Sequence, residues 1–322
     1  MLFINLKTLK TAAFGLLIII SAIISGCGSG PSGKKKRELI SFKPYNGINY
    51  SEVSRRQKNG LSFNEYGYQL EPQWKLKFVS DDSVSIFSPT KNAFINFPLT
   101  RGYDSIFNAA RSWLKIRKIN KDSITMEILI QKGDSLDVKG TKVFMRFFAD
   151  NYIKNVLHTD TTTLRRPSRA DTLFIRSLAV KAKADYTKAF AARQPADISS
   201  KSPLVTVSRR TTKPDILNNF DNSDDYLDPT YDIVIKNAYK DFYYSFTMYI
   251  DDKGRLFYGI PLVGFNGEKE IEADYIHASK AVMESYFNFY LNVKPGTTLG
   301  IIHSSMVSVH VEGKAKAKTA AK

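Results

Sequence analysis

The amino-acid sequence predicts an α+β protein with an N-terminal, mainly antiparallel β domain, a linking helix and a C-terminal β-β-α-β module. Three observations predict this class. Short runs in which apolar and polar residues alternate fill residues 39–158. A helical period appears between residues 171 and 194. Two alternating runs, a second helical stretch and a final alternating run follow between residues 242 and 311.

The N-terminal domain, residues 39–158, is expected to consist of short strands between turns. Trp74, Leu76 and Phe78 alternate with lysines, as in a half-buried strand. Further strands are predicted at residues 84–86, 93–97, 113–119, 124–130 and 143–148, with turns at Asp81-Asp82, Asn120-Lys121-Asp122 and Gly133-Asp134. We expect Pro98 to end the run at 93–97 and residues 103–110 to form a helical turn.

Residues 159–225 are expected to hold one helix and a linker. Five apolar residues fall near one face of the predicted helix: Leu173, Leu178, Ala182, Tyr186 and Phe190. Pro195 is expected to end this helix. The stretch 195–230 is rich in Pro, Ser, Thr, Asn and Asp, which indicates a long loop with one strand at residues 204–207.

The C-terminal module, residues 226–313, has the clearest pattern. Aromatic and apolar residues alternate with polar ones from 242 to 250, and Asp251-Asp252-Lys253-Gly254 predicts a hairpin turn before a second strand at 256–260. A helix is predicted over 271–286 and a last strand over 307–311. Residues 314–322 alternate Lys and Ala and are expected to form a disordered basic tail.

The N-terminus carries a targeting signal. Lys7 and Lys10 precede an apolar run, which ends in small residues before Cys27. The run is too short to span a membrane, which takes about 20 apolar residues. Residues 1–26 are therefore read as a signal peptide and residues 27–38 as a flexible tether. The basic cluster at 34–37 either attracts anionic lipid head groups or is simply solvated.

Ile24-Ser25-Gly26-Cys27 resembles the lipobox of bacterial lipoproteins. The resemblance implies cleavage between Gly26 and Cys27 and lipidation of the Cys27 thiol, with palmitate among the acyl chains. The alternative is an ordinary secretory peptide with a chance cysteine. Acyl chains add about 0.8 kcal/mol of membrane affinity per buried CH₂ group. Gly28 is not the aspartate that retains lipoproteins at the inner membrane, so the resemblance implies a cell-envelope location, at the outer membrane.

The net charge and the cysteine content limit which classes of partner and which kinds of site the protein can have. Residues 1–26 hold two lysines and no acid, so the formal charge falls from +16 to +14 without them. The secretion signal excludes nucleic acid, and anionic lipid, lipopolysaccharide or acidic cell-wall polymer remain. Cys27 is the only cysteine, so no thiol is left for a disulfide, for catalysis or for zinc once it is acylated.

The C-terminal module also resembles the C-terminal domain of TonB-type energy transducers. The matching pieces are residues 246–255 around the Asp-Lys-Gly turn, the helix from 271 to 286, and residues 294–300 before the last strand. The resemblance implies a shared fold for less than a third of the chain. The Tyr-Pro-x-x-Ala start of that family is missing, and a lipid signal stands in place of its membrane helix, so no transducer function is carried over.

The sequence holds no catalytic spacing, and no catalytic residue, metal or cofactor is expected. The four histidines, His158, His277, His303 and His310, form no HExxH pair, and His303 and His310 have opposite strand parity. Residues 221–225 place oxygens at alternate positions, as a calcium loop does, but Tyr226 replaces the required glycine. The aromatic run 286–290 is read as core, with a glycan or peptide groove as the alternative.

These observations favour a lipid-anchored cell-envelope protein that is not an enzyme and acts as a binding or structural module. The expected partner, besides the membrane, is an envelope protein or peptidoglycan. Two alternatives stay open. One is an envelope hydrolase whose site is assembled across the domains, and the other is an accessory subunit of an envelope transport or assembly machine.

Overall fold

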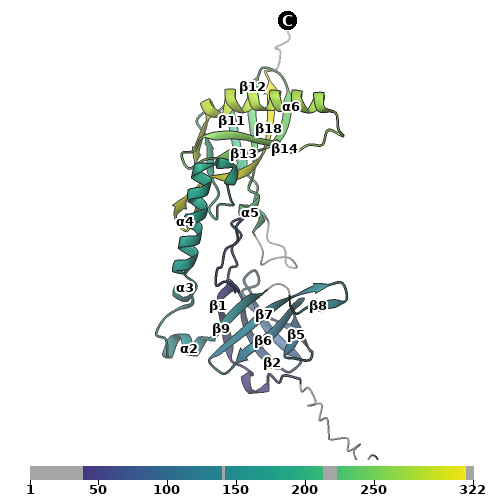
Figure 1. The fold of residues 1–322 in the computed structure, drawn as a ribbon, viewed down its shortest axis with the longest axis vertical. Helices are drawn as coiled ribbons and strands as arrows, with labels where there is room; N and C mark the ends of the chain where they lie inside the picture. Colours follow the sequence, from purple (N-terminus) through teal and green to yellow (C-terminus); the bar gives the residue numbers. More distant parts are fainter. Residues whose placement is uncertain (1–38, 140–141, 213–222, 317–322) are drawn as a thin grey trace, which may run out of the picture.

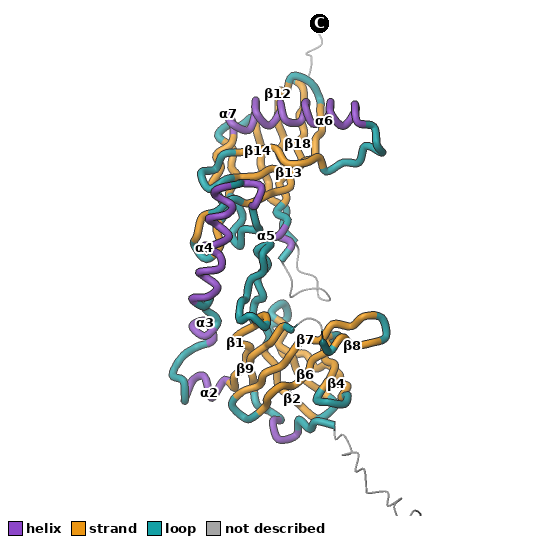
Figure 2. The backbone as a smooth tube through the Cα atoms, viewed as in Figure 1, coloured by secondary structure: helices purple, strands orange, loops and turns teal. Residues whose placement is uncertain are grey.

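A computed structural model describes residues 39–139, 142–212 and 223–316 of the 322-residue chain. Two sheets, one near each end of a long molecule, are joined by a helix and an extended loop (Figures 1 and 2). The expected α+β class is confirmed, with a large antiparallel sheet followed by a β-β-α-β arrangement. Gly26 and Cys27, and with them the signal and tether, lie outside the described residues.

The N-terminal domain is one antiparallel sheet that closes on itself. Its strands are β1 (Asn49–Gln57), β2 (Lys75–Ser80), β3 (Ser83–Ser88), β4 (Ala93–Arg101), β5 (Ile106–Ala109), β6 (Ser112–Ile119), β7 (Ser123–Lys132), β8 (Ser135–Asp137) and β9 (Val143–Ala149). The order is β6-β5-β4-β3-β2-β1-β9-β7-β8, and β6 also pairs with β7, which completes the ring. Side chains alternate along each strand, so every second residue points inward.

The interior of this ring is filled by apolar side chains. Leu76, Ile124 and Phe147 are among the buried residues that different strands contribute. A 3₁₀ turn at Lys43–Tyr45 follows Phe42, whose ring stacks on Phe78 with centroids 4.2 Å apart and helps to close one end. The ring is therefore a packed core, and the hydrophobic effect on these side chains holds the strands together.

Two expectations for this domain are wrong. Residues 106–109 are strand β5 and not part of a helical turn, because they pair with both β4 and β6. Pro98 lies inside β4 and does not end it. At Pro98 the pairing with β3 stops, and pairing with β5 starts at Leu99. A residue without an N–H is tolerated in a strand where a ladder hydrogen bond is not required.

The linking helix is α4 (Arg169–Ala184), preceded by α2 (Asp150–Asn155) and α3 (Thr161–Leu164) and followed by a 3₁₀ turn at Tyr186–Lys188. It ends at Ala184, well before Pro195. The next residue, Asp185, caps the 3₁₀ turn, because its side chain accepts from Thr187 N–H. The expected apolar face is only partly correct. Leu173 is 53% exposed, whereas Ile175 and Ala179 are buried instead.

The loop between β1 and β2, residues 58–74, runs beside α4 to the second domain (Figure 2). Its Phe63 is buried with Ile175, Ala182 and Phe190 in a small core of its own. Gly67 lies against the backbone of Ala191 at φ +88°, so closely that a Cβ would collide with it. The loop and the helix therefore form one packed column between the domains.

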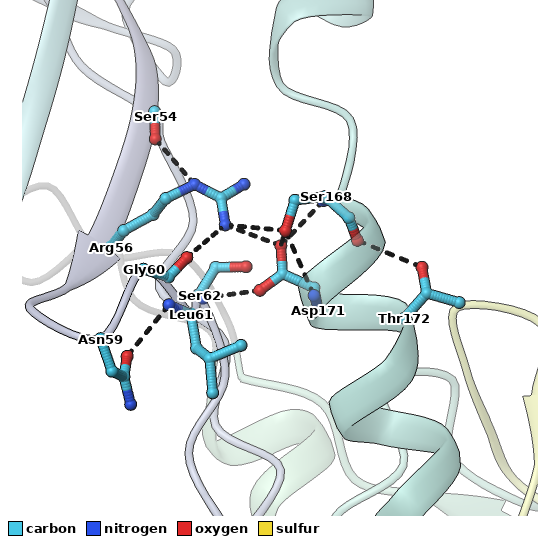
Figure 3. A network of polar contacts seen from close by, with 9 residues as sticks. All are labelled: Ser54, Arg56, Asn59, Gly60, Leu61, Ser62, Ser168, Asp171 and Thr172. Atoms are coloured by element: carbon cyan, nitrogen blue, oxygen red, sulfur yellow. Dashed lines mark hydrogen bonds and ion pairs between the residues drawn. The ribbon is translucent and has the colours of Figure 1, made fainter.

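Where the column meets the N-terminal domain, the buried carboxylate of Asp171 joins α4 to β1 and to the loop (Figure 3). One oxygen accepts from Ser62 N–H at 2.8 Å, and the other contacts the Arg56 guanidinium at 2.8 Å and Ser168. Ser168 and Asp171 also cap the start of α4 reciprocally. Burial acts to raise the pKa of Asp171, but these hydrogen bonds outweigh it and hold the pKa below its usual value.

The C-terminal module is a five-stranded sheet with one long helix. Its strands are β11 (Val205–Arg209), β12 (Thr230–Ala238), β13 (Phe242–Ile250), β14 (Leu256–Pro261) and β18 (Ser305–Ala315), in the order β11-β12-β18-β13-β14. The smaller elements beside it are β10 (Asp197–Ser200), α5 (Asp224–Leu227), α7 (Asn288–Tyr290), β15 (Leu291–Lys294), β16 (Thr297–Thr298) and β17 (Ile301–Ile302). Strand β12, which the sequence pattern did not predict, runs parallel to β18.

Helix α6 (Lys269–Val282) covers one face of this sheet and continues into a π-helical turn at Met283–Phe287. Val282, Met283 and Phe287 pack on the inward side chains of β12, β13 and β18. The hairpin turn after β13 is confirmed, and Gly254 takes the positive φ of +80° that it needs. Among residues 39–139, 142–212 and 223–316, no helix has the length and apolarity to cross a membrane.

We predict that Asp171→Ala lowers the unfolding free energy by about 3 kcal/mol, because it leaves Arg56 and the Ser62 N–H without their buried partner. Urea unfolding followed by circular dichroism measures the change. Glu65→Ala, an exposed residue of the same loop, is the matched control and should stay within about 0.5 kcal/mol of the wild type.

The same variant has a pH signature. The pKa of Asp171 is lowered in the folded state, so its contribution is complete above the unfolded value near 3.9 and is lost as the pH falls through the folded value. The stability gap between wild type and Asp171→Ala should therefore shrink on going from pH 7 to pH 3. A gap that is the same at both pH values would contradict the assigned role.

Candidate functional site

One face of the C-terminal sheet is turned away from α6, and its side chains around Ser245 and His310 are polar. Along β13 the side chains of Phe246 and Met248 point to α6, and those of Tyr243, Ser245 and Thr247 point away from it. Strand β18 alternates in the same way, with the valines inward and the polar side chains outward. We call this surface, with Asp232 of β12, the polar face.

Three side chains from neighbouring strands form a row across the polar face. Strand register places His310 of β18 directly opposite Ser245 of β13 on one side and Asp232 of β12 on the other. The Nδ1 atom of His310 lies 2.7 Å from the Oγ of Ser245 and 3.3 Å from the hydroxyl of Tyr243. The row is thus joined by hydrogen bonds at its serine end.

Asp232, at the other end of the row, is paired with Arg210, which follows β11. The guanidinium donates to both carboxylate oxygens, at 2.8 and 2.6 Å. This hydrogen-bonded pair holds the pKa of Asp232 below its usual value. Burial lowers the pKa of His310, and the charge of Arg210 lowers it further, so the imidazole is neutral at pH 7.

A neutral histidine beside a serine is the arrangement of a general base and a nucleophile, but two features argue against that chemistry here. Ser245 is only 4% exposed, so a substrate has no open approach to its hydroxyl. Both oxygens of Asp232 are held by Arg210, so the carboxylate does not orient the imidazole as the third member of a triad does. The row is better suited to holding the exposed side chain beside it, that of Tyr243, in a fixed position.

Two open hollows flank the row. The first, of about 670 Å³, lies where β13 and β18 pair and is lined by Asp241, Phe242, Tyr243, Glu312, Gly313 and Lys314. A Cβ at Gly313 would collide with the Phe242 ring, so the ring lies directly over this glycine. The second hollow, of about 490 Å³, is lined by Arg210, Thr211, Thr212, Asp224, Asp225, Asp228 and Thr230. Tyr243 stands at the edge of the first hollow and is 60% exposed.

The remaining histidines are not part of this site. His158 and His277 are exposed and lie far apart in the chain. His303 precedes β18 and is buried, its ring stacked on Phe190 at 3.7 Å. Its Nδ1 donates to the carbonyl of Ser304 at 2.9 Å, which leaves Nε2 to accept from the Thr298 hydroxyl at 3.0 Å. It is therefore a neutral histidine that joins the column to the C-terminal module.

The other candidate features of the sequence have structural explanations. Asp225 accepts from the N–H and hydroxyl of Thr212, and residues 221 and 222 of the calcium-like stretch lie outside the described residues. Asp224 and Asp225 begin the short helix α5. In the described part of the chain, no three His, Cys, Asp or Glu side chains are grouped so as to hold a metal ion.

The aromatic run at 286–290 is divided between core and surface. Phe287 is buried in the core under α6, and Tyr286 and Tyr290 pack at its margin. Phe289 is 74% exposed.

The sequence pattern contained only part of the polar face. The alternation of 242–250 and 307–311 placed Ser245 and His310 on the outward sides of their strands. Asp232 could not be added, because β12 was not predicted and its pairing with β18 joins distant parts of the chain.

His303 should make stability depend on pH. Burial lowers its pKa from 6.5 to about 4, so the unfolded chain binds a proton at a pH where the folded chain does not. We expect the unfolding free energy to fall by up to about 3 kcal/mol between pH 6.5 and pH 4, with no contribution above pH 6.5. In urea unfolding, the His303→Gln variant should be less stable than the wild type at pH 7, but its unfolding free energy should lack this dependence on pH. An equal pH dependence in both proteins would contradict the role assigned to His303.

A scan against models of known protein families gives no match for this chain. A search of curated proteins gives none either.

Proposed function

We propose that this chain is a lipid-anchored protein of the bacterial cell envelope that acts by binding a protein or cell-wall partner through the polar face. The anchor is Cys27, at the end of a lipobox-like signal, and the outer membrane is the proposed location. The partner is met by the C-terminal module. No reaction is assigned to the protein.

The arrangement of the domains supports a membrane anchor at the N-terminal end and partner binding at the C-terminal module. The described chain begins at the end of the N-terminal domain that points away from the C-terminal module (Figure 1). An anchor that precedes Leu39 therefore joins the molecule at the far end from the polar face. The packed column of α4 and residues 58–74 keeps the C-terminal module at a distance from that end.

The observation that carries the proposal is the composition of the polar face. The whole chain is strongly basic, at +16, yet the two hollows are lined by five carboxylates and two basic side chains. The carboxylates are those of Asp224, Asp225, Asp228, Asp241 and Glu312, and the basic side chains are Arg210 and Lys314. A sixth carboxylate, that of Asp232, belongs to the row beside them. An exposed tyrosine beside fixed carboxylates suits a partner rich in hydrogen-bond donors. Sugar hydroxyl groups of a cell-wall glycan and basic side chains of an envelope protein both meet that description.

A hydrolase is the second candidate, because Ser245 and His310 are in hydrogen-bond contact. It requires the buried serine to become accessible. Labelling of the wild type, but not of Ser245→Ala, by a fluorophosphonate probe would favour it over the binding proposal.

We predict that Cys27→Ser yields an unprocessed precursor without lipid, since no other thiol is present to take the diacylglycerol. Metabolic labelling with an alkyne fatty acid, followed by gel analysis, measures this directly. Ser25→Ala, which keeps a small residue in the signal, should be labelled normally. Lipid incorporation into Cys27→Ser at the wild-type level would refute the anchor.

We predict that Tyr243→Ala weakens partner binding by roughly threefold to tenfold, through loss of an exposed aromatic contact. Sedimentation of residues 38–322 with isolated peptidoglycan sacculi measures binding to the cell wall, and crosslinking of the full-length protein in intact cells measures binding to envelope proteins. Tyr103→Ala, which is 64% exposed in the N-terminal domain, is the matched control and should bind like the wild type. If both variants bind equally well, the polar face is not the binding surface.

A further inference from the structure

A third hollow lies outside the polar face, where the N-terminal ring meets the column. It is open, has a volume of about 750 Å³, and is lined by Gln57, Lys58, Asn59, Tyr68, Leu70, Lys142 and Val143. Gln57 and Val143 are paired residues of β1 and β9, so the floor is the last step of this ladder. Tyr68 and Leu70 come from the returning half of the 58–74 loop.

One wall of this groove, the turn after β1, is held by several hydrogen bonds. The turn after β1 is closed by Gln57 N–H donating to Leu61 and by the Asn59 side chain accepting from Leu61 N–H. The Arg56 guanidinium donates to the carbonyl of Gly60 at 2.8 Å while it is paired with Asp171 (Figure 3). The network that begins α4 thus also fixes the turn that carries Lys58. A ligand that binds in the groove therefore does not have to order this turn, which lowers the entropic cost of binding.

The lining combines apolar surface with two cations. Leu70, Val143 and the Tyr68 ring supply the apolar part of the groove. Lys58 and Lys142 are the two charged side chains of the lining. Within the described ranges neither ammonium is in an ion pair with a carboxylate. Two unpaired positive charges beside an apolar hollow complement a molecule with an apolar body and an anionic end.

We infer that this groove binds a long-chain fatty acid, with its hydrocarbon chain along Leu70 and Val143 and its carboxylate between Lys58 and Lys142. The volume is in the range of about 300–1,000 Å³ typical of pockets for one small ligand, which suits a single acyl chain. Burial of the chain supplies affinity, and the two ammonium groups select the ionised carboxylate. The site is independent of the polar face and of the proposed partner there.

The test is a fluorescence titration of residues 28–322, which keep every described residue, with the fluorescent fatty acid cis-parinaric acid. We expect saturable binding, and a Kd that rises about tenfold or more in Lys58→Glu/Lys142→Glu, because two attractive contacts become repulsive. The matched control is Lys118→Glu/Lys121→Glu. These exposed lysines carry the same charge change at the opposite end of the ring, and this variant should bind like the wild type.

Two further measurements test the charged and the apolar contacts of the groove separately. The methyl ester of the probe should bind at least about tenfold more weakly than the acid, since it lacks the charge that the lysines select. Leu70→Gln, in a partly exposed loop position, should also weaken binding while circular dichroism stays unchanged. The inference is overturned by equal affinity for acid and ester, by equal loss of affinity in both lysine pairs, or by absence of saturable binding.

Discussion

The arrangement of this molecule depends on one buried carboxylate, that of Asp171. It accepts hydrogen bonds from three places that are distant in the sequence: Arg56 at the end of β1, Ser62 in the long loop, and Ser168 at the start of α4. A buried charge is tolerated only when it is paired and hydrogen-bonded. The carboxylate therefore keeps the end of β1, the long loop and the start of α4 together. The direction in which α4 leaves the N-terminal domain is set at this point.

The consequences of that constraint extend to both ends of the column. Toward the C-terminal module, α4 and the loop place Phe63 and Phe190 in a small core that includes Leu299 and Ile301 at its margin. Arg193 adds a contact by pairing with Glu71 while its guanidinium lies 4.5 Å from the Tyr226 ring. Toward the N-terminal domain, Arg56, which binds Asp171, also donates a hydrogen bond to the turn beside the lysine-lined groove. One network thus supports the spacing of the domains and the shape of that groove.

The C-terminal module depends on a different constraint, the insertion of β18 between β12 and β13. This central strand pairs antiparallel with β13 and parallel with β12, so its outward side chains meet neighbours on both sides. His310 is held there by Ser245, and Asp232 by Arg210. The proposed binding role follows from this: the groups of the row are fixed and satisfied, and the exposed aromatic and acidic side chains around them remain accessible to a partner.

The sequence by itself determined the period of most strands and of both long helices, the hairpin turn at Gly254, and the lipobox-like signal. These features are set by neighbours in the chain: alternation along a strand, turn residues, and small residues before a cysteine. Only the tertiary structure decided that β5 is a strand, that Pro98 is tolerated within β4, that Leu173 faces solvent and that β12 joins β18. Each of these depends on pairing or burial against residues distant in the sequence, as does the burial of Asp171, and a local pattern carries no record of such contacts.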